Sequence, residues 1–230
     1  MVEVLDNLIV KAARAVARGD DPARAIRAEE DEMVDLYELI YLTVFPAFAE
    51  IRFEAPTAKQ APEELEKSWI EAARVFVASR PVEARIKHVL DSTIAWVQGI
   101  VSEALAEGTP IREMAKEIVD KWTDPVSEIN VNRAKRIART EVISAANAGS
   151  HQGAGDTGVE MRHFWISTFD GRTRPAHDTR QHPSLAEPIP LEQSFFVDGE
   201  SLRWPGDPSG SAGNVIQCRC VEGYEPVTEG

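Results

Sequence analysis

The chain has 230 residues, 43% of them apolar, and a formal net charge of −13 at pH 7. This length and apolar content allow one substantial core or two small ones, so we expect most of the chain to be folded rather than disordered. The negative charge argues against a protein that coats nucleic acid with its whole surface, because neutralising phosphates requires clustered Lys and Arg.

Neither a membrane protein nor a disulfide-stabilised protein fits this sequence. No run of about 18 apolar residues exists, as a membrane-spanning helix would need. The start, Met1-Val2-Glu3-Val4-Leu5-Asp6, has neither the basic flank nor the unbroken apolar stretch of a signal peptide. Cys218 and Cys220 are the only cysteines, and bridging them would close a strained ring, so we expect reduced thiols. The prediction is a soluble protein made in the cytoplasm, without contact to a membrane.

Apolar residues at helical spacing characterise residues 1–61, which we predict to be an N-terminal helical segment with a linker. The first helix has its apolar positions at Val4, Leu8, Ala12 and Val16. The run Gly19-Asp20-Asp21-Pro22 ends this helix and offers a new start. A further helix is expected to end near Phe45, because Pro46 would break it. Residues 55–61 are the expected linker before a helix start at Pro62.

Residues 62–149 show the same spacing and are predicted to form a helical bundle. Its longest helix has about six turns and stops at Gly108. Thr109 then offers an N-cap, with Pro110 at the first helical position. Asp124-Pro125 breaks that helix, and a last helix continues to about Gly149.

Beyond residue 149 the chain is punctuated by glycine and proline, and we predict a small domain with short antiparallel strands over residues 150–230. Alternating apolar residues predict a strand over residues 159–169, followed by a turn at Asp170-Gly171. Asp198-Gly199 between two apolar runs predicts a hairpin. Residues 214–221 are expected to form a last strand. The predicted fold class is therefore α+β, with a multi-helix N-terminal region.

Basic residues are concentrated between two acidic parts of the chain. Residues 131–182 hold eight basic and five acidic residues, whereas residues 183–230 hold two basic and eight acidic residues. Such a segment can meet phosphate or an acidic partner, or it can be a solvated helix face. The candidates for contact with DNA or a partner are Arg133, Lys135, Arg136 and Arg139.

Several polar motifs follow one another in the second half of the chain. They are Arg139-Thr140-Glu141, Trp165, the series Asp170, Arg172, Arg174 and His177, then Pro205-Gly206-Asp207-Pro208 and Cys218-Arg219-Cys220. In order, spacing and number they resemble the phage Mu F-like minor head proteins, a family of phage head morphogenesis proteins, over residues of about 90–222. The family often has a glycine-bearing turn after the histidine, and here Thr179-Arg180-Gln181-His182-Pro183 takes its place.

The resemblance implies a structural minor head protein of a tailed double-stranded DNA phage, not an enzyme. Such a protein would act in head morphogenesis at or near the portal vertex and belong to the virion, in the capsid interior or at that vertex. Its expected partners are the portal protein and other head proteins, with non-specific contact to packaged DNA and no small-molecule substrate. The family-motif residues Arg139, Thr140, Glu141, Trp165, Asp170, Arg172, Arg174, His177, Cys218 and Cys220 are expected to organise the C-terminal domain.

His177, Cys218 and Cys220 have two interpretations. Thiolate and imidazole are the usual zinc ligands, and His163, His182 or Asp170 could complete a tetrahedron. Structural zinc sites favour Cys-x₂₋₄-Cys, however, and a single intervening residue makes ligation by both sulfurs awkward. We therefore favour buried cysteines in a terminal strand with no cofactor, and His177 donating a hydrogen bond to a backbone carbonyl.

Two other functional classes compete with the structural one. Asp170, Arg172, Arg174 and His177 could serve a metal-dependent phosphodiesterase or nuclease, but the chain lacks the repeated carboxylates of two-metal hydrolases. We favour a structural turn in which Asp170 pairs with Arg172 or Arg174. Residues 105–122 superficially resemble a helix-turn-helix, yet the acidic residues of the second helix are unsuited to the major groove.

Overall fold

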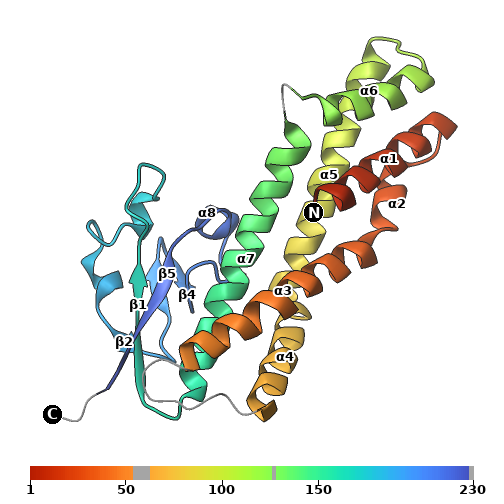
Figure 1. The fold of residues 1–230 in the computed structure, drawn as a ribbon. Coiled ribbons are helices and arrows are strands. Elements are labelled where there is room, and N and C mark those ends of the chain that lie inside the picture. The colour runs from red at the N-terminus through yellow and green to blue at the C-terminus, as the bar shows by residue number, and fades with distance from the viewer. Residues whose placement is uncertain (54–62, 126–127, 228–230) are drawn as a thin grey trace. The chain divides into compact units, whose positions relative to one another are not determined.

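The computed structural model describes residues 1–53, 63–125 and 128–227 (Figure 1). The predicted linker at residues 55–61 and the predicted helix start at Pro62 lie outside the described residues. By its internal contacts the chain divides into two compact units, Met1–Tyr37 with Val82–Ala138, and Glu38–Pro81 with Arg139–Gly230. Each unit thus combines two separate stretches of sequence. The sequential division into residues 1–61, 62–149 and 150–230 stays a prediction.

Helices make up the first unit. Its elements are α1 (Val2–Arg18), α2 (Pro22–Arg27), α6 (Ile111–Thr123), the first part of α3 (Glu30–Phe53), most of α5 (Arg80–Ala106) and the first part of α7 (Ile129–Asp156). Gly19 ends α1 with a φ of 77°, and the Asp21 side chain caps α2 by accepting from Ala23 N at 2.9 Å. Both boundaries confirm the predicted stop and start. Glycine tolerates the positive φ at the end of α1, and the Asp21 carboxylate satisfies a backbone N–H that has no partner within α2.

The apolar faces of α1 and α6 pack together in this unit. Leu5, Leu8 and Ile118 are buried there, and Trp122 Nε1 donates to Asp6 Oδ1 at 2.7 Å. The N-cap of α6 is Pro110, so the predicted cap at Thr109 is wrong by one residue. Thr109 N instead donates to Ala104 O at 2.8 Å, which makes it part of the C-terminal turn of α5.

Two helices are longer than predicted, and both belong in part to the second unit. Helix α3 continues through Pro46 to Phe53, and α7 continues past Gly149 to Asp156. The two helices approach closely, because a Cβ on Gly149 would lie 2.2 Å from Phe45 O and one on Gly153 would lie 2.1 Å from Ala49 O. The glycines therefore serve helix packing instead of ending α7, and this packing outweighs the helix-breaking tendency of Pro46.

The second unit also contains α4 (Glu63–Val77) and the strands. A three-stranded antiparallel sheet has the order β2 (Ile189–Pro190), β1 (Met161–Ile166) and β5 (Val221–Pro226) (Figure 1). Strand β1 is shorter than the predicted 159–169. Strands β3 (Phe195–Val197) and β4 (Glu200–Leu202) form the predicted hairpin, with positive φ at Asp198 and Gly199. Asp170 O accepts from Thr173 N, which confirms the predicted turn.

The predicted strand at residues 214–221 is wrong. Residues Ala212–Val215 form a short helix, α8, and an irregular segment follows before β5. The backbone turns there because Cys218 N donates to Val215 O at 3.1 Å and Gln217 has a φ of 58°. Two 3₁₀ turns, η1 (Pro175–His177) and η2 (Pro183–Ala186), occupy the proline-rich stretch between β1 and β2.

Two apolar clusters form the core of the second unit. The first contains Trp165, Leu185, Phe195, Val197, Leu202, Cys218 and Cys220. The second joins Phe45, Ala73 and Ala148 from the helices with Trp204 from the loop after β4. None of the helices in the described part of the chain is both long and apolar enough to cross a membrane.

Candidate functional site

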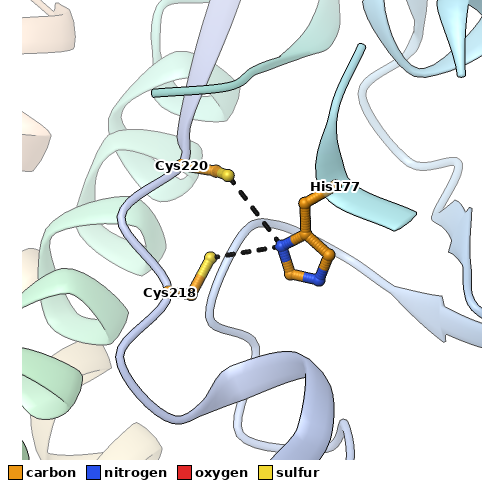
Figure 2. Close-up of side chains that lie close together, drawn as sticks. All are labelled: His177, Cys218 and Cys220. Carbon is orange, nitrogen blue, oxygen red and sulfur yellow. Dashed lines mark hydrogen bonds between the residues drawn. The ribbon is translucent and has the colours of Figure 1, made fainter. Parts of the chain in front are cut away.

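His177, Cys218 and Cys220 meet in the first apolar cluster of the second unit (Figure 2). His177 Nδ1 lies 3.6 Å from Cys218 Sγ and 3.9 Å from Cys220 Sγ. All three residues are buried, and both cysteines are free. The cysteines lie in the segment between α8 and β5, so their predicted place in a terminal strand is wrong at Cys218 and Cys220 alike.

The second ring nitrogen of His177 is held by Asn214. His177 Nε2 lies 3.1 Å from Asn214 Oδ1, and Asn214 Nδ2 donates to Val197 O at 3.3 Å. Since the amide nitrogen is used on the carbonyl, the amide oxygen faces the ring, and His177 Nε2 carries the proton. The predicted hydrogen bond to a backbone carbonyl is therefore wrong: the acceptor is a side chain. In the neutral ring, His177 Nδ1 is the nitrogen without a proton, and it faces both sulfurs.

The two cysteine side chains interact with each other. A hydrogen bond from Cys218, together with His177 and despite burial, lowers the pKa of Cys220 to about 5. The hydrogen bond between the same two sulfurs raises the pKa of Cys218 far above its usual range. The two thiols therefore titrate as a pair, in which Cys220 loses its proton before Cys218.

Trp165 closes one side of this cluster. Its ring packs edge-on against His177 at 5.2 Å and against Phe195 at 5.4 Å between ring centroids. Its indole N–H is buried without a hydrogen bond of normal geometry, but it lies near Cys220 and favours the thiolate. The predicted tryptophan strand therefore places its aromatic ring against the histidine.

Three arginines line a small hollow beside His177 and the cysteines. The hollow measures about 10 Å³, close to the room one water molecule needs, and it is lined by Arg172, Arg174 and Arg219 as well as by His177 and both cysteines. Arg174 Nη2 donates to the backbone oxygen of Ile216. The side chain is thereby tied to the segment that carries Cys218.

Asp170 holds two of these arginines. Its carboxylate accepts two hydrogen bonds from Arg219, one of them at 2.6 Å from Arg219 Nη2, and a further one from Arg172 N at 2.9 Å. The Arg219 hydrogen bond lowers the pKa of Asp170 well below its usual range. The expected pair of Asp170 with Arg172 is present at 3.3 Å. Arg219 is the stronger partner, and the sequence did not indicate it.

Residues of α7 hold the cysteine segment from the helix side. Arg139 Nη1 donates to Gln217 Oε1 at 3.3 Å, and Thr140 Oγ1 accepts from Gln217 N at 3.0 Å. The buried Glu141 accepts from Tyr41 Oη at 2.9 Å. The Arg-Thr-Glu motif therefore joins α7 to the loop before β5 and to α3.

Asn147 and Asp207 have structural roles that sequence reasoning missed. Asn147 Nδ2 donates to Pro205 O at 2.7 Å and to Cys220 O at 3.1 Å. The fully buried Asp207 carboxylate accepts from Arg203 N, Arg203 Nε and Ser209 N at 2.9 to 3.0 Å. Burial raises the pKa of Asp207, but these hydrogen bonds outweigh it and the net shift is downward. The position of Asp207 within Pro-Gly-Asp-Pro was the only sequence signal.

A second cluster contains His151, His163 and Glu222. Glu222 Oε1 lies 3.1 Å from His151 Nδ1 and is also hydrogen-bonded to His163 Nδ1, while Tyr224 Oη donates to Glu222 Oε2 at 2.7 Å. His163 Nε2 donates to Gln193 O at 2.8 Å. Burial by itself raises the pKa of Glu222. The hydrogen bonds with the two histidines lower this pKa by more, so the net shift is downward. His163 therefore belongs to this network rather than to the cysteines, and His182 is exposed.

The four basic candidates on α7 differ in their surroundings. Arg133 is half-buried and donates from Nη2 to Val89 O, Ser92 Oγ and Thr93 Oγ1 at 2.6 to 3.0 Å. Burial lowers the pKa of Arg133. Lys135, Arg136 and Arg139 are exposed on the same helix. Arg133 thus has an internal role, whereas the other three are exposed, with Arg139 also bonded to Gln217.

These features define an α+β protein whose polar motifs meet around a buried histidine and two cysteines. Comparison with known protein families identifies the family to which the chain belongs. The chain matches the family described as "Phage Mu protein F like protein" over residues 95–222, more than half of its length. It belongs to this family, the Mu F-like phage head morphogenesis proteins.

Two curated proteins show more distant similarity. The NAD(+)–arginine ADP-ribosyltransferase EFV of Enterococcus faecalis (strain ATCC 700802 / V583) is 25% identical over 158 residues, 65% of this chain and 30% of that protein. YqbB of Bacillus subtilis (strain 168) is 22% identical over 204 residues, 79% of this chain and 64% of that protein. The chain thus spans less than two thirds of either relative. No solved structure matches it.

Proposed function

We propose that this protein is a structural minor head protein of a tailed double-stranded DNA phage, acting at or near the portal vertex during head morphogenesis. The match to the Mu F-like family over residues 95–222 carries the proposal. The portal protein and other head proteins are its partners, and it remains in the virion, in the capsid interior or at the portal vertex. Packaged DNA is contacted through phosphates without reading bases.

The contacts of the family-motif residues support a structural role for them. Arg139, Thr140 and Arg174 bond to the cysteine segment, Glu141 bonds to Tyr41, and Asp170 bonds to Arg219. Each polar group is used to join two elements of the same unit. Breaking such a contact would release the element that it holds, and at the buried Tyr41 it would also leave a polar group unsatisfied.

The alternative is a metal-dependent phosphodiesterase or nuclease that uses Asp170, Arg172, Arg174 and His177. Three of these four side chains have different partners within the protein: Asp170 binds Arg219, Arg174 binds a backbone oxygen, and His177 faces sulfur. The hollow beside them measures about 10 Å³, whereas ligand sites usually have roughly 300–1,000 Å³. The Enterococcus faecalis relative is named as an NAD(+)–arginine ADP-ribosyltransferase, but this chain spans only 30% of that protein.

The proposal is tested by locating the chain in phage particles. We expect mass spectrometry of particles purified from a lysate of the source phage to find it, and a pull-down with the portal protein to retain it. Arg174→Ala should weaken both signals through loss of folding, whereas Arg112→Ala, an exposed residue of α6, should leave both unchanged. Absence from particles together with hydrolysis of a phosphodiester by the folded chain would overturn the proposal in favour of the enzyme.

Contact with DNA is tested separately on α7. Lys135 and Arg136 are exposed there, so Lys135→Gln with Arg136→Gln should reduce the salt dependence of DNA binding by a slope of about 2, roughly 1 for each lost phosphate contact. A matched control is Lys116→Gln with Lys121→Gln on α6, which removes two exposed charges elsewhere. Equal slopes for the two double variants, measured by fluorescence anisotropy on random-sequence duplex DNA, would exclude these two residues as DNA contacts.

A further inference from the structure

His177, Cys218 and Cys220 have the separations of ligands around one tetrahedral ion. Zinc binds imidazole nitrogen at about 2.0–2.1 Å and thiolate sulfur at about 2.3 Å, which puts neighbouring tetrahedral ligands about 3.6 Å apart. The Nδ1 to Sγ distances of 3.6 and 3.9 Å agree with this edge length. Figure 2 shows both cysteine side chains directed at the same ring nitrogen. The single lone pair of Nδ1 can accept only one thiol proton, but a central ion would engage all three atoms.

The irregular backbone at Gln217 allows both cysteine sulfurs to approach one ion, although only one residue separates the two cysteines. Gln217 has a φ of 58°, and Cys218 N donates to Val215 O at 3.1 Å. The chain therefore turns just before Cys218 instead of running extended. Both sulfurs reach His177 Nδ1 from this turn, so the spacing that disfavours ligation in a regular strand does not prevent it here.

Asn214 fixes His177 in the state that a metal requires. A histidine ligand usually donates its other ring N–H to a protein acceptor, which sets the tautomer and the ring orientation. His177 Nε2 has such a partner in Asn214 Oδ1 at 3.1 Å, and Asn214 is itself oriented by Val197 O. The nitrogen facing the sulfurs is thus the one that offers a lone pair.

The hollow beside the cluster supplies a fourth position. It holds about 10 Å³, has Arg172, Arg174 and Arg219 in its lining, and reaches His177 and both cysteines. Three protein ligands with a remaining open position are typical of zinc sites that bind water or a small anion. The positive charge of the guanidinium groups favours water or a small anion as the fourth ligand over a cationic or apolar group.

We infer that His177 Nδ1, Cys218 Sγ and Cys220 Sγ bind one zinc ion whose fourth ligand is a water molecule in the arginine-lined hollow. The second cluster does not share this geometry. His151, His163 and Glu222 also lie close enough together to hold an ion, but Glu222 Oε1 is hydrogen-bonded directly to both histidines, so these groups already satisfy one another. The inference concerns the isolated chain and does not depend on the place of the protein in the particle.

Metal analysis of the purified full chain tests the inference. Wild type grown with zinc and then passed through metal-free buffer should retain about one zinc per chain. Cys218→Ser and Cys220→Ser should each lower the zinc content at least tenfold, as expected for loss of a ligand. His151→Asn, which changes the second cluster, should keep the wild-type content. Less than about a tenth of an equivalent in wild type, or loss of zinc in His151→Asn alone, contradicts the inference.

Cobalt substitution keeps the test decisive if the cysteine variants fail to fold. Replacing zinc by Co²⁺ in the wild-type chain should give the thiolate-to-cobalt charge-transfer bands and intense visible bands of a tetrahedral site with two sulfur ligands. Weak bands of an octahedral ion without sulfur would overturn the assignment. Because the cobalt spectrum is recorded on the wild-type chain, this test does not require a stable variant.

Discussion

At the scale of single residues, buried polar side chains that bond to the backbone organise the second unit. Asn147 joins Pro205 O and Cys220 O, Asn214 joins Val197 O and His177, and Asp207 holds the Pro-Gly-Asp-Pro loop. Each satisfies groups that would otherwise be buried without a partner, at a cost of about 1–3 kcal/mol per group. The loops around the cysteines are thus held by specific bonds, since few of their residues lie in strands or long helices.

Asp207 makes the stability of this loop dependent on pH. Its folded pKa lies below the unfolded value of about 3.9. The carboxylate therefore contributes stability above about pH 3.9, and this contribution is lost as the pH falls through the folded pKa. We expect Asp207→Asn to lower the free energy of unfolding by about 1.5–3 kcal/mol at pH 7. The difference from wild type should shrink in acid.

Urea unfolding followed by tryptophan fluorescence over a pH series measures this difference. Asp198→Asn makes the same charge change in the exposed turn between β3 and β4, and it should stay within about 0.5 kcal/mol of wild type. A destabilisation by Asp207→Asn that does not change between neutral and acid pH would refute the role assigned to the Asp207 charge.

At the scale of elements, the contact between α3 and α7 requires two glycines. Gly149 and Gly153 lie one turn apart on α7, and the backbone oxygens of Phe45 and Ala49 take the space in which their Cβ atoms would lie. Backbone atoms cannot move aside as a flexible side chain can. A methyl group at either position must therefore separate the two helices or distort one of them.

We expect Gly153→Ala to destabilise the protein by about 1–3 kcal/mol or more. Gly155→Ala adds the same methyl group to the same helix, but its Cβ would meet only Leu191 Cδ2 at an ordinary 3.7 Å. That variant should be neutral or slightly stabilising, because alanine favours the helix over glycine. Thermal unfolding followed by circular dichroism compares the two, and equal melting temperatures would contradict the close packing.

At the scale of the whole molecule, the second unit combines residues that are far apart in the chain. Trp204 packs with Phe45, Ala73 and Ala148, and Trp69 Nε1 donates to Asp156 Oδ2 at 2.8 Å. The segment after residue 149 therefore shares its core with helices from the first half of the sequence. Removing all residues before 150 exposes Trp204 and leaves Pro205 O without Asn147.

We expect a fragment of residues 150–230 to remain unfolded by itself. Residues 38–81 co-expressed with residues 139–230 supply both stretches of the second unit and should give a folded complex. Dispersion of amide signals in NMR spectra distinguishes the two outcomes. A dispersed spectrum from residues 150–230 alone would show instead that the sequential division of the chain describes its folding.

Local sequence determined the helices, their sharper ends and the β3–β4 hairpin, because apolar spacing, Gly19, Asp21 and Asp198-Gly199 act through neighbouring residues. The ordered motifs from Arg139 to Cys220 also indicated the family. Only the tertiary structure decided that α3 passes Pro46 and that α7 passes Gly149. It also decided that helix α8 and an irregular segment replace most of the strand expected at residues 214–221. It likewise revealed Arg219, Asn214 and Asn147 as partners of the family-motif residues. Close helix packing and hydrogen bonds from side chains to distant backbone atoms outweigh the local conformational preferences of Pro46, Gly149 and the segment before β5. The spacing of residues along the chain does not indicate which distant groups will come into contact.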